Sequence, residues 1–253
     1  MEFYMSEIFP VSAERHGKKT LLPLSSYAFA AKQNLVPLVA SEFSSVIHRF
    51  PIVFIKSQEE YGVFALLGLT QGQNLFVDPA GRWVSDYVPA TFRRYPFVFA
   101  SSGDSEKYVL CIDEKSGLLA DTGGEPLFTA EGEKAPALEK AMSFVTEYQK
   151  SALMSKKLCD TLTEYELLAP LALQLQTDKD KAVKIEGLVR VDEQKLNTLE
   201  SEKFMHLRNT GLLALIYAHF FSLANLQGLA NRMKAAKMPR PEKKIAIPND
   251  FTF

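Results

Sequence analysis

The pattern of the sequence changes near residue 130, and this change constrains the fold more than any other feature. Before it, short apolar runs alternate with turn residues, and 17 of the 28 aromatic residues lie in the first 100. After it, apolar residues recur every three or four positions, which is the helical period. We therefore expect an α+β fold. An antiparallel β-rich lobe (1–130) packs on a helical lobe (131–238) with one β-hairpin, and 239–253 form an extended tail. A single domain overall is the alternative.

The first lobe contains two pairs of similar segments, each separated by an offset of 45 residues. The segments that match are 49–54 with 94–99 and 63–69 with 108–114. Each copy predicts a strand, a polar turn and a second strand. A short helix is expected before each copy, over Ser41–Arg49 and around Ala90–Arg94. We expect both hairpins in one antiparallel sheet. Between them, the sequence predicts a strand over Asn74–Asp78 and a type I turn at Asp78–Gly81.

The second lobe predicts one amphipathic helix of about 30 residues, which begins at Pro136 and ends before Pro170. A hairpin over 171–191 follows, turning at Asp178–Lys181. Asp192 is expected to cap a helix over Glu193–Leu199, and Ser201 one over Glu202–Arg208 that Gly211 ends. A last helix is expected over Leu212–Lys237.

This last helix contains 23 residues without a formal charge, Asn209–Asn231. The length is sufficient to span a bilayer. Polar residues interrupt it, however, and no other segment resembles a span, so we favour a buried core helix and no membrane span.

The charge balance and the termini limit the classes of function. Lysine plus arginine is 29 and aspartate plus glutamate 30, so a nucleic-acid partner is not expected. The first residues carry Glu2 and Glu7 and no apolar run, which predicts no signal peptide and a cytoplasmic location. Surface association would need a signal-independent route. Cys111 and Cys159 are expected to be reduced structural thiols, Cys111 because the adjacent acids Asp113 and Glu114 disfavour a thiolate.

Motifs that define a cofactor or a metal site are missing from the sequence, so neither is expected. The first weaker candidate site is a dense cluster of arginines, acids and aromatic residues. Its members are Asp78, Arg82, Trp83, Asp86, Tyr87, Arg93, Arg94 and Tyr95. Arginine grips carboxylate or phosphate in a bidentate way, so a ligand pocket or a protein-binding hot spot is one interpretation. Ion pairs that pin a loop to the sheet are the interpretation we favour.

A second candidate is a polar stripe on the uncharged helix, made of His219, Ser222 and Asn225 at i, i+3 and i+6. Such a stripe either lines a cavity, where it positions a ligand or a general base, or forms an internal hydrogen-bond network between the lobes. We favour the network. The basic segment Arg232–Lys244 suits an anionic surface or, more simply, a solvated helix end.

Blocks along almost the whole chain resemble the bacterial SapC family. They are PVSAERH (10–16), YAFA (27–30), VPLVASEF (36–43), FPIVF (50–54), LGLTQGQNLFVDPAGRW (67–83), YVPATFRRYPFVF (87–99), LCIDE (110–114), VDEQKL (191–196) and LIYAHFFSLANL (215–226). The family takes its name from a protein associated with a surface layer, and members are often labelled peptide-transport permeases. The permease label does not fit a chain with at most one spanning segment. The resemblance implies an accessory role and supplies no catalytic residues.

These observations favour a non-enzymatic binding, accessory or surface-layer-associated protein. Its partner is an unknown protein or a small anionic ligand. The alternative is an enzyme, or an enzyme accessory, that binds an anionic small molecule or peptide between the lobes. Arg82, Arg93 and Arg94 would then hold the anion, with His219 near the reacting group.

Overall fold

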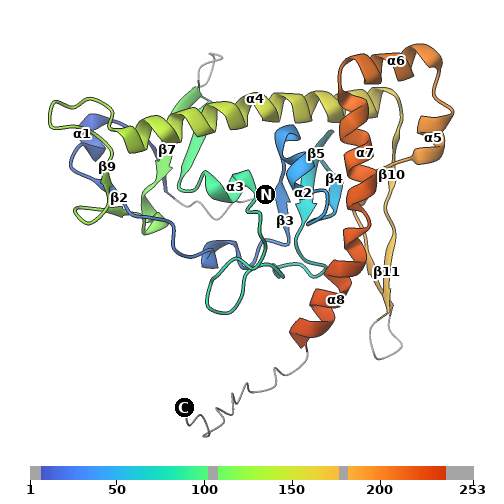
Figure 1. Ribbon diagram of the computed structural model, residues 1–253, viewed down its shortest axis with the longest axis horizontal. Helices are drawn as coiled ribbons and strands as arrows, with labels where there is room; N and C mark the ends of the chain where they lie inside the picture. Colours follow the sequence, from blue (N-terminus) through green and yellow to red (C-terminus); the bar gives the residue numbers. More distant parts are fainter. Residues whose placement is uncertain (1–6, 102–107, 177–181, 238–253) are drawn as a thin grey trace, which may run out of the picture.

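The structure is a computed structural model that describes residues 7–101, 108–176 and 182–237. Its fold is α+β, as predicted. Figure 1 shows the long helix α4 (Pro136–Glu164) running above the sheets from one end of the molecule to the other, with α7 (Leu212–Ser222) standing at one end. The predicted tail 239–253 and most of the basic segment Arg232–Lys244 lie outside the described residues.

The largest sheet has five antiparallel strands in the order β10-β13-β4-β5-β3. Their bounds are β10 Leu168–Pro170, β13 Leu188–Val191, β4 Ile52–Ser57, β5 Glu60–Leu66 and β3 Leu35–Pro37. Strands from both 1–130 and 131–238 contribute to it, so the two segments interlock in one sheet. Ile52, Val53 and Phe54 of β4 are fully buried on both faces, which suits the central strand.

A second sheet has three strands in the order β1-β7-β6. Its members are β1 Ile8–Pro10, β7 Tyr108–Asp113 and β6 Phe97–Ser101. Both predicted hairpins therefore form, as β4–β5 and β6–β7, but the expectation that they share one sheet is wrong. The reason is that β13 and β3 already occupy the outer edges of the β4–β5 pair, so neither edge is free for the second hairpin.

The hairpin predicted over 171–191 corresponds to two antiparallel strand pairs. β13 pairs with β10, and β11 (Leu173–Gln176) pairs with β12 (Ala182–Ile185). The predicted turn at Asp178–Lys181 lies outside the described residues. A further small sheet has the order β8-β2-β9, with bounds Leu119–Ala120, Thr20–Leu21 and Glu125–Pro126.

α4 has 29 residues and begins at Pro136, as predicted. Its C-terminal half places Leu158 and Leu162 in the large core beside the five-stranded sheet. Its N-terminal half places Leu138 and Val145 in a smaller core beside β6 and β7. One helix is therefore packed into two cores.

The short helical segments lie in connections between the strands. They are α1 Ala13–His16, η1 Ala28–Ala30, η2 Ala40–Glu42, α2 Phe43–Val46, α3 Ala90–Arg93 and η3 Glu114–Ser116. The expected helix over Ser41–Arg49 corresponds to η2 and α2, and the expected turn around Ala90–Arg94 to α3. The predicted strand Asn74–Asp78 is absent. Val77 makes a single bridge with Trp83. The Asn74 side chain accepts a hydrogen bond from Phe76 N within its own loop. The turn at Asp78–Gly81 is confirmed, since Gly81 N donates to Asp78 O at 2.9 Å.

The helices near the C-terminal end follow the prediction with two corrections. Asp192 caps α5 (Glu193–Asn197) by accepting from Gln194 N and Lys195 N. We expected Ser201 to cap α6 (Ser201–Asn209), but it is the first residue of that helix. The cap position belongs to Glu200, whose side chain makes no capping bond.

The helix predicted over Leu212–Lys237 is two helices, α7 and α8 (Asn225–Lys237), joined by a turn at Leu223 and Ala224. The break lies beside Ser222, whose hydroxyl donates back to His219 O at 2.6 Å. Within the described residues, Leu212–Ala236 is the one segment that is long and apolar enough to cross a membrane. Only 28% of its apolar window is buried, and Tyr217 and Phe221 of α7 are exposed. The expected buried core helix is therefore only partly buried, through residues such as Leu212 and Ile216.

Two blocks of the sequence that are far apart meet at the β1–β7 edge. Pro10 pairs with Cys111, and the Arg15 guanidinium forms a bidentate ion pair with Glu114. The buried His16 ring lies 3.1 Å from the same carboxylate through Nε2. Hydrogen bonding from Arg15 is the main reason that the pKa of Glu114 is lowered to about 2. This contact fastens the N-terminal segment to β7.

Candidate functional site

The candidate site lies beneath α4, where η2 and α3 meet. Glu42, at the end of η2, is almost fully buried and bonds both segments. Its Oε2 accepts from Val39 N at 3.0 Å, and its Oε1 accepts from Ala90 N at 2.6 Å and from the Tyr87 hydroxyl at 3.0 Å. The carboxylate therefore sets where α3 begins, and so where the arginines that follow it lie.

Arg93 is held by aromatic rings on both sides. Its guanidinium carbon is 5.4 Å from the ring centroid of Tyr87 and 5.1 Å from that of Phe144. Nε donates to Val88 O at 3.0 Å, and Nη2 donates to the Tyr87 hydroxyl at 3.1 Å. Cation–π contacts of this kind fix the side chain. Among the described residues no carboxylate lies within 4 Å of the guanidinium, although its charge acts on the nearby Glu42 carboxyl group. Arg93 is thus a positioned cation.

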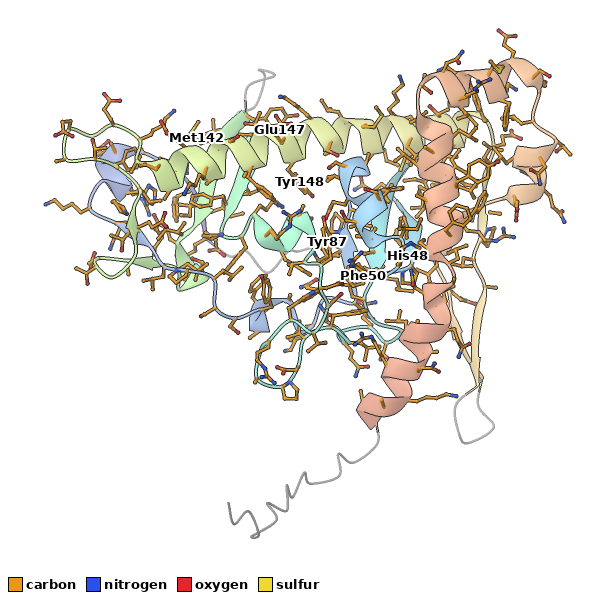
Figure 2. All side chains as sticks on the ribbon, in the orientation of Figure 1. His48, Phe50, Tyr87, Met142, Glu147 and Tyr148 are labelled. Atoms are coloured by element: carbon orange, nitrogen blue, oxygen red, sulfur yellow. The ribbon has the colours of Figure 1, made fainter. Side chains whose placement is uncertain are left out.

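Arg94 lies over the ring of Tyr148, with its guanidinium carbon 5.1 Å from the centroid. Nη1 donates to Phe97 O at 3.4 Å, which is a long bond. The buried Nε has no hydrogen-bond partner among the described residues. Tyr148 lies below α4 in Figure 2, and its hydroxyl is 2.9 Å from that of Thr91 in α3. This contact joins α4 to α3 directly above the arginines.

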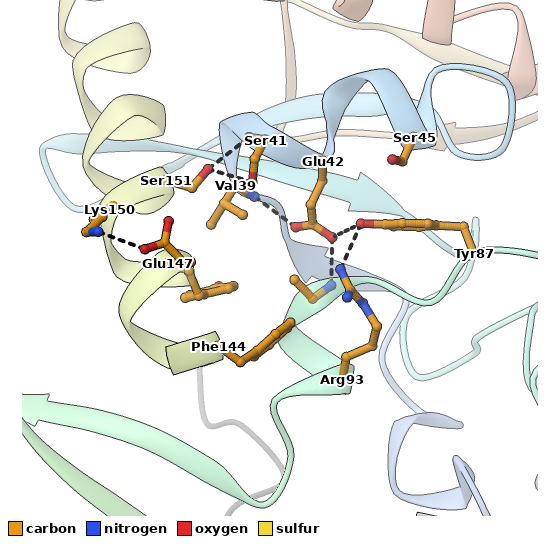
Figure 3. Close-up of a pocket in the computed structure, with 12 residues that line it drawn as sticks. Val39, Ser41, Glu42, Ser45, Tyr87, Arg93, Phe144, Glu147, Lys150 and Ser151 are labelled. Carbon is orange, nitrogen blue, oxygen red and sulfur yellow. Dashed lines mark hydrogen bonds and ion pairs between the residues drawn. The ribbon is translucent and has the colours of Figure 1, made fainter. Parts of the chain in front are cut away.

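Two clefts open on this arrangement, and both are lined by Arg93 and Phe144. The first has a volume of about 520 Å³ and is shown in Figure 3. Its lining residues are Val39, Ser41, Glu42, Ser45, Tyr87, Ala90, Arg93, Phe144, Glu147, Tyr148, Lys150 and Ser151. The second has a volume of about 400 Å³. Its lining residues are Leu21, Arg93, Arg94, Tyr95, Phe97, Glu125, Ala137, Lys140, Ala141, Phe144 and Val145. Each volume is that of a small-molecule site.

The first cleft is closed at one side by a bridge between η2 and α4. Ser41 N donates to the Ser151 hydroxyl at 2.8 Å, and that hydroxyl donates to the Ser41 side chain at 2.9 Å (Figure 3). At the rim, Lys150 pairs with Glu147 at 2.7 Å. The charges of this cleft are therefore largely balanced by one another.

Burial dominates the electrostatics around Glu42. It raises the pKa of the carboxyl group above its usual value, even though two backbone N–H groups, the Tyr87 hydroxyl and the nearby Arg93 charge all favour the ionised form. Burial, together with the Glu42 charge, raises the pKa of Tyr87 to about 12. The Tyr87 phenol therefore stays protonated and serves as a hydrogen-bond donor to Glu42.

Other predicted members of the arginine cluster are held in internal ion pairs. Arg82 pairs with Asp78 at 2.7 Å, and Asp86 accepts two bonds from Arg49 at 2.6 Å. Backbone and side-chain bonds from Arg82 lower the pKa of Asp78, and the side-chain bonds from Arg49 lower that of Asp86. Neither Arg82 nor Asp86 is among the residues that line the two clefts.

Two predicted aromatic residues have different surroundings. Trp83 donates its indole N–H to Tyr87 O at 2.7 Å and stacks on Phe76, so it belongs to the large core. Tyr95 stacks on Phe29 with centroids 4.3 Å apart and also lines the second cleft. Burial is the main reason that the pKa of Tyr95 is raised to about 12.

The polar stripe on α7 and α8 forms an internal network, the arrangement that we favoured from the sequence. His219 is fully buried; its Nδ1 donates to Ile52 O at 2.8 Å, and its Nε2 accepts from Val191 N at 3.1 Å. Ser222 accepts from Ile52 N at 2.9 Å, and Asn225 donates to Ile47 O at 2.8 Å. Burial lowers the pKa of His219 to about 4, so the ring is neutral at pH 7. His219 and Ser222 bind α7 to β4 and β13, and Asn225 binds the start of α8 to the end of α2.

Neither cysteine is suited to nucleophilic chemistry. Cys111 and Cys159 are both buried, and burial raises the pKa of both thiols, that of Cys159 to about 12. Among the described residues there is no group of three or more His, Cys, Asp or Glu side chains placed to hold a metal ion.

Several residues of the clefts were missed from the sequence. Glu42 could have been found, because it is the single acid in the apolar stretch VPLVASEF (36–43). Tyr148 has the spacing of an apolar residue of α4, and nothing in that spacing indicates that it covers an arginine. Lys140, Phe144 and Ser151 carry no local signal, since only the packing of α4 on α3 and η2 brings them to the clefts.

Comparison with known proteins identifies the family of this chain. Searches against curated proteins and against solved structures gave no match. The model of the SapC family matches residues 11–229, which include η2, α3 and the length of α4 and therefore all the residues that line the two clefts. The resemblance seen in the sequence blocks is thus confirmed over most of the chain, which belongs to the SapC family.

Proposed function

We propose that this SapC-family chain is a non-enzymatic binding protein and that the two clefts beneath α4 are its ligand site. The observation that carries the proposal is the placement of Arg93. It lies between both clefts, is fixed by Tyr87 and Phe144, and has no ion pair within 4 Å among the described residues. A cation held rigidly in this way binds an anion with little loss of side-chain freedom.

The surroundings of the candidate reactive groups support binding rather than catalysis. Both oxygens of Glu42 accept bonds from the backbone or from Tyr87, so the carboxylate is occupied in positioning α3. Both ring nitrogens of His219 bond backbone groups in the core, and the residue does not line either cleft. The enzymatic alternative, in which His219 lies near the reacting group, therefore draws no support from its position.

An accessory role, of the kind that the family resemblance implies, fits a chain that captures a ligand without converting it. In this proposal Arg93, Arg94 and Tyr95 are the binding residues from the predicted set. Arg82, Trp83 and Asp86 hold the loop before α3. His219 and Ser222 hold α7 against the sheet, and Asn225 holds α8 against the end of α2.

The test is a screen of the full chain against a panel of anionic metabolites and short acidic peptides, read by thermal unfolding. A ligand bound only by the native state at 100 times its dissociation constant adds about 2.7 kcal/mol to the free energy of unfolding. For a chain of this size that corresponds to a rise in Tm of roughly 5–10 °C. Mass spectrometry of the recovered ligand tests for conversion.

Variants in the same stretch of chain provide the control. Arg93→Gln is expected to abolish the ligand-induced rise in Tm, whereas Arg82→Gln, outside both clefts, is expected to keep it. Each variant is compared with its own ligand-free Tm, which separates binding from stability. A panel in which no member raises Tm overturns the proposal. If the recovered ligand is chemically changed, the result supports the enzymatic alternative.

A further inference from the structure

The second cleft carries an excess of unpaired positive charge. Arg93, Arg94 and Lys140 line it together with one acid, Glu125, which is exposed on β9. None of the three cations has a carboxylate within 4 Å among the described residues, whereas Arg15, Arg49 and Arg82 each have one. Three cations around a cleft of about 400 Å³ repel one another unless an anion lies between them.

Arg94 has most of its hydrogen-bonding capacity unused. Its single described hydrogen bond is the long one from Nη1 to Phe97 O, at 3.4 Å. Its Nε is the one buried side-chain nitrogen or oxygen in the described part of the chain that has no partner. Leaving a charged donor unsatisfied costs more than leaving a neutral one. Because the Nε atom is buried and the residue is partly exposed, an acceptor in the cleft would contact the terminal nitrogens of the guanidinium.

The remaining wall of this cleft is apolar. Leu21, Ala141 and Phe144 contribute partly exposed hydrocarbon surface beside the cations, whereas Phe97 and Val145, which also line the cleft, are almost fully buried. A bare inorganic ion would leave that surface in contact with water. An organic anion buries it, while its charged group reaches the guanidinium groups.

We propose that the second cleft binds an organic oxyanion, a carboxylate or a phosphate ester carried on an apolar or aromatic body of small-molecule size. The anionic group is held by Arg94 and Lys140, with Arg93 completing the charge, and the body packs on Leu21, Ala141 and Phe144. The inference rests on the proposed binding function, for which it names the ligand class and the residues.

The experiment measures binding to the full chain by calorimetry with four probes: benzoate, phenyl phosphate, benzyl alcohol and inorganic phosphate. One or both of the aromatic anions are expected to bind, and their ratio tells a carboxylate site from a phosphate site. Benzyl alcohol, which lacks the charge, and inorganic phosphate, which lacks the body, are each expected to bind at least about tenfold more weakly, a difference of about 1.4 kcal/mol. Affinity for the aromatic anions is expected to fall as salt is added.

Two variants locate the site and one serves as the matched control. Arg94→Gln and Lys140→Gln are expected to weaken the aromatic anions by about tenfold or more. Lys140 is exposed on α4, so its replacement leaves the fold intact even if Arg94→Gln does not fold. Lys156→Gln removes a lysine of the same helix that is already paired with Glu60 and Asp160 and lines neither cleft, and is expected to leave affinity unchanged.

The outcomes separate this inference from the proposed function. No binding by either aromatic anion up to about 10 mM, where the binding free energy would be weaker than about −3 kcal/mol, overturns the inference. Equal binding of inorganic phosphate, or binding that survives Lys140→Gln, also overturns it. If a ligand from the broader panel loses binding in Arg93→Gln but keeps it in Arg94→Gln and Lys140→Gln, the proposed function is supported and the inference about the second cleft is overturned. Failure of every ligand removes both.

Discussion

The Glu42 carboxylate accepts a hydrogen bond of 2.6 Å from the backbone nitrogen of Ala90, 48 residues further along the chain. This bond fixes the first turn of α3, and α3 carries Arg93 and leads into Arg94. The geometry of the clefts therefore depends on Glu42 of η2, which is far from α3 in the sequence. Its effects on stability and on binding can be separated by mutation.

Glu42→Gln is expected to reduce the free energy of unfolding by about 1–3 kcal/mol, because one of the two oxygens becomes an NH₂ group that faces a backbone donor. It is also expected to weaken ligand binding, since α3 loses its anchor. Urea denaturation measures the first effect. Glu147→Gln, at an exposed ion pair of α4, is expected to change stability by less than about 1 kcal/mol. Equal effects of the two changes would contradict the anchoring role of Glu42.

His219 makes the stability of the fold depend on pH in a defined window. Its pKa is lowered from 6.5 to about 4, so the unfolded chain binds this proton more readily than the folded one. The contribution of the neutral ring is complete above pH 6.5 and is lost as the pH falls toward 4. The loss is about 3 kcal/mol over that window.

The measurement is urea denaturation of the wild type and of His219→Gln at a series of pH values between 4 and 7. The variant is expected to be less stable at pH 7, because its side chain does not reproduce both backbone bonds. It is also expected to lose this component of the pH dependence. Parallel pH profiles for the two proteins would show that another group titrates in the window.

Ser222 bonds the central strand of the large sheet. Its hydroxyl accepts from Ile52 N and donates to His219 O, and all three groups are buried. Ser222→Ala leaves the Ile52 nitrogen without its acceptor, and we expect a loss of about 1–3 kcal/mol by chemical denaturation. Ser44→Ala, at an exposed position of α2, is the control and is expected to stay within about 0.5 kcal/mol of the wild type.

The two thiols are expected to be unreactive while the chain is folded. Both are buried with raised pKa values, so the thiolate fraction at pH 8 is small and reagents cannot reach the sulfur. Titration with a chromogenic disulfide should give two slow groups in buffer and two fast groups in denaturant. A fast group in the native protein would place one cysteine in an accessible site.

Local signals in the sequence predicted several elements well. Pro136 and the apolar spacing that follows it gave α4 its start and length, and Asp192 marked the start of α5. The pairing of the hairpins was not predictable in the same way, because the apolar runs at 52–55 and 97–99 look alike in sequence. What separates them is that β13 and β3, which are distant in sequence, take the edges beside the first hairpin.

The same distinction applies to the candidate site. Arg93 and Arg94 stand out in sequence because they form a cationic pair among aromatic residues, yet Arg82 stands out for the same reason and lies elsewhere, paired with Asp78. Only the packing of α3 under α4 separates them. Lys140 and Phe144 show no feature in sequence beyond their place on a helix, since their role comes from what α4 covers.

The position of α4 in two cores has a consequence for how the molecule comes apart. Its N-terminal half is held by Leu138 and Val145 and its C-terminal half by Leu158 and Leu162. The second cleft lies along the N-terminal half, and the first cleft extends into the stretch between the two cores. We expect that without a ligand either core can open along α4 before the other. A ligand that fills the clefts would join the two into one cooperative unit, so that occupancy becomes visible as a single unfolding transition.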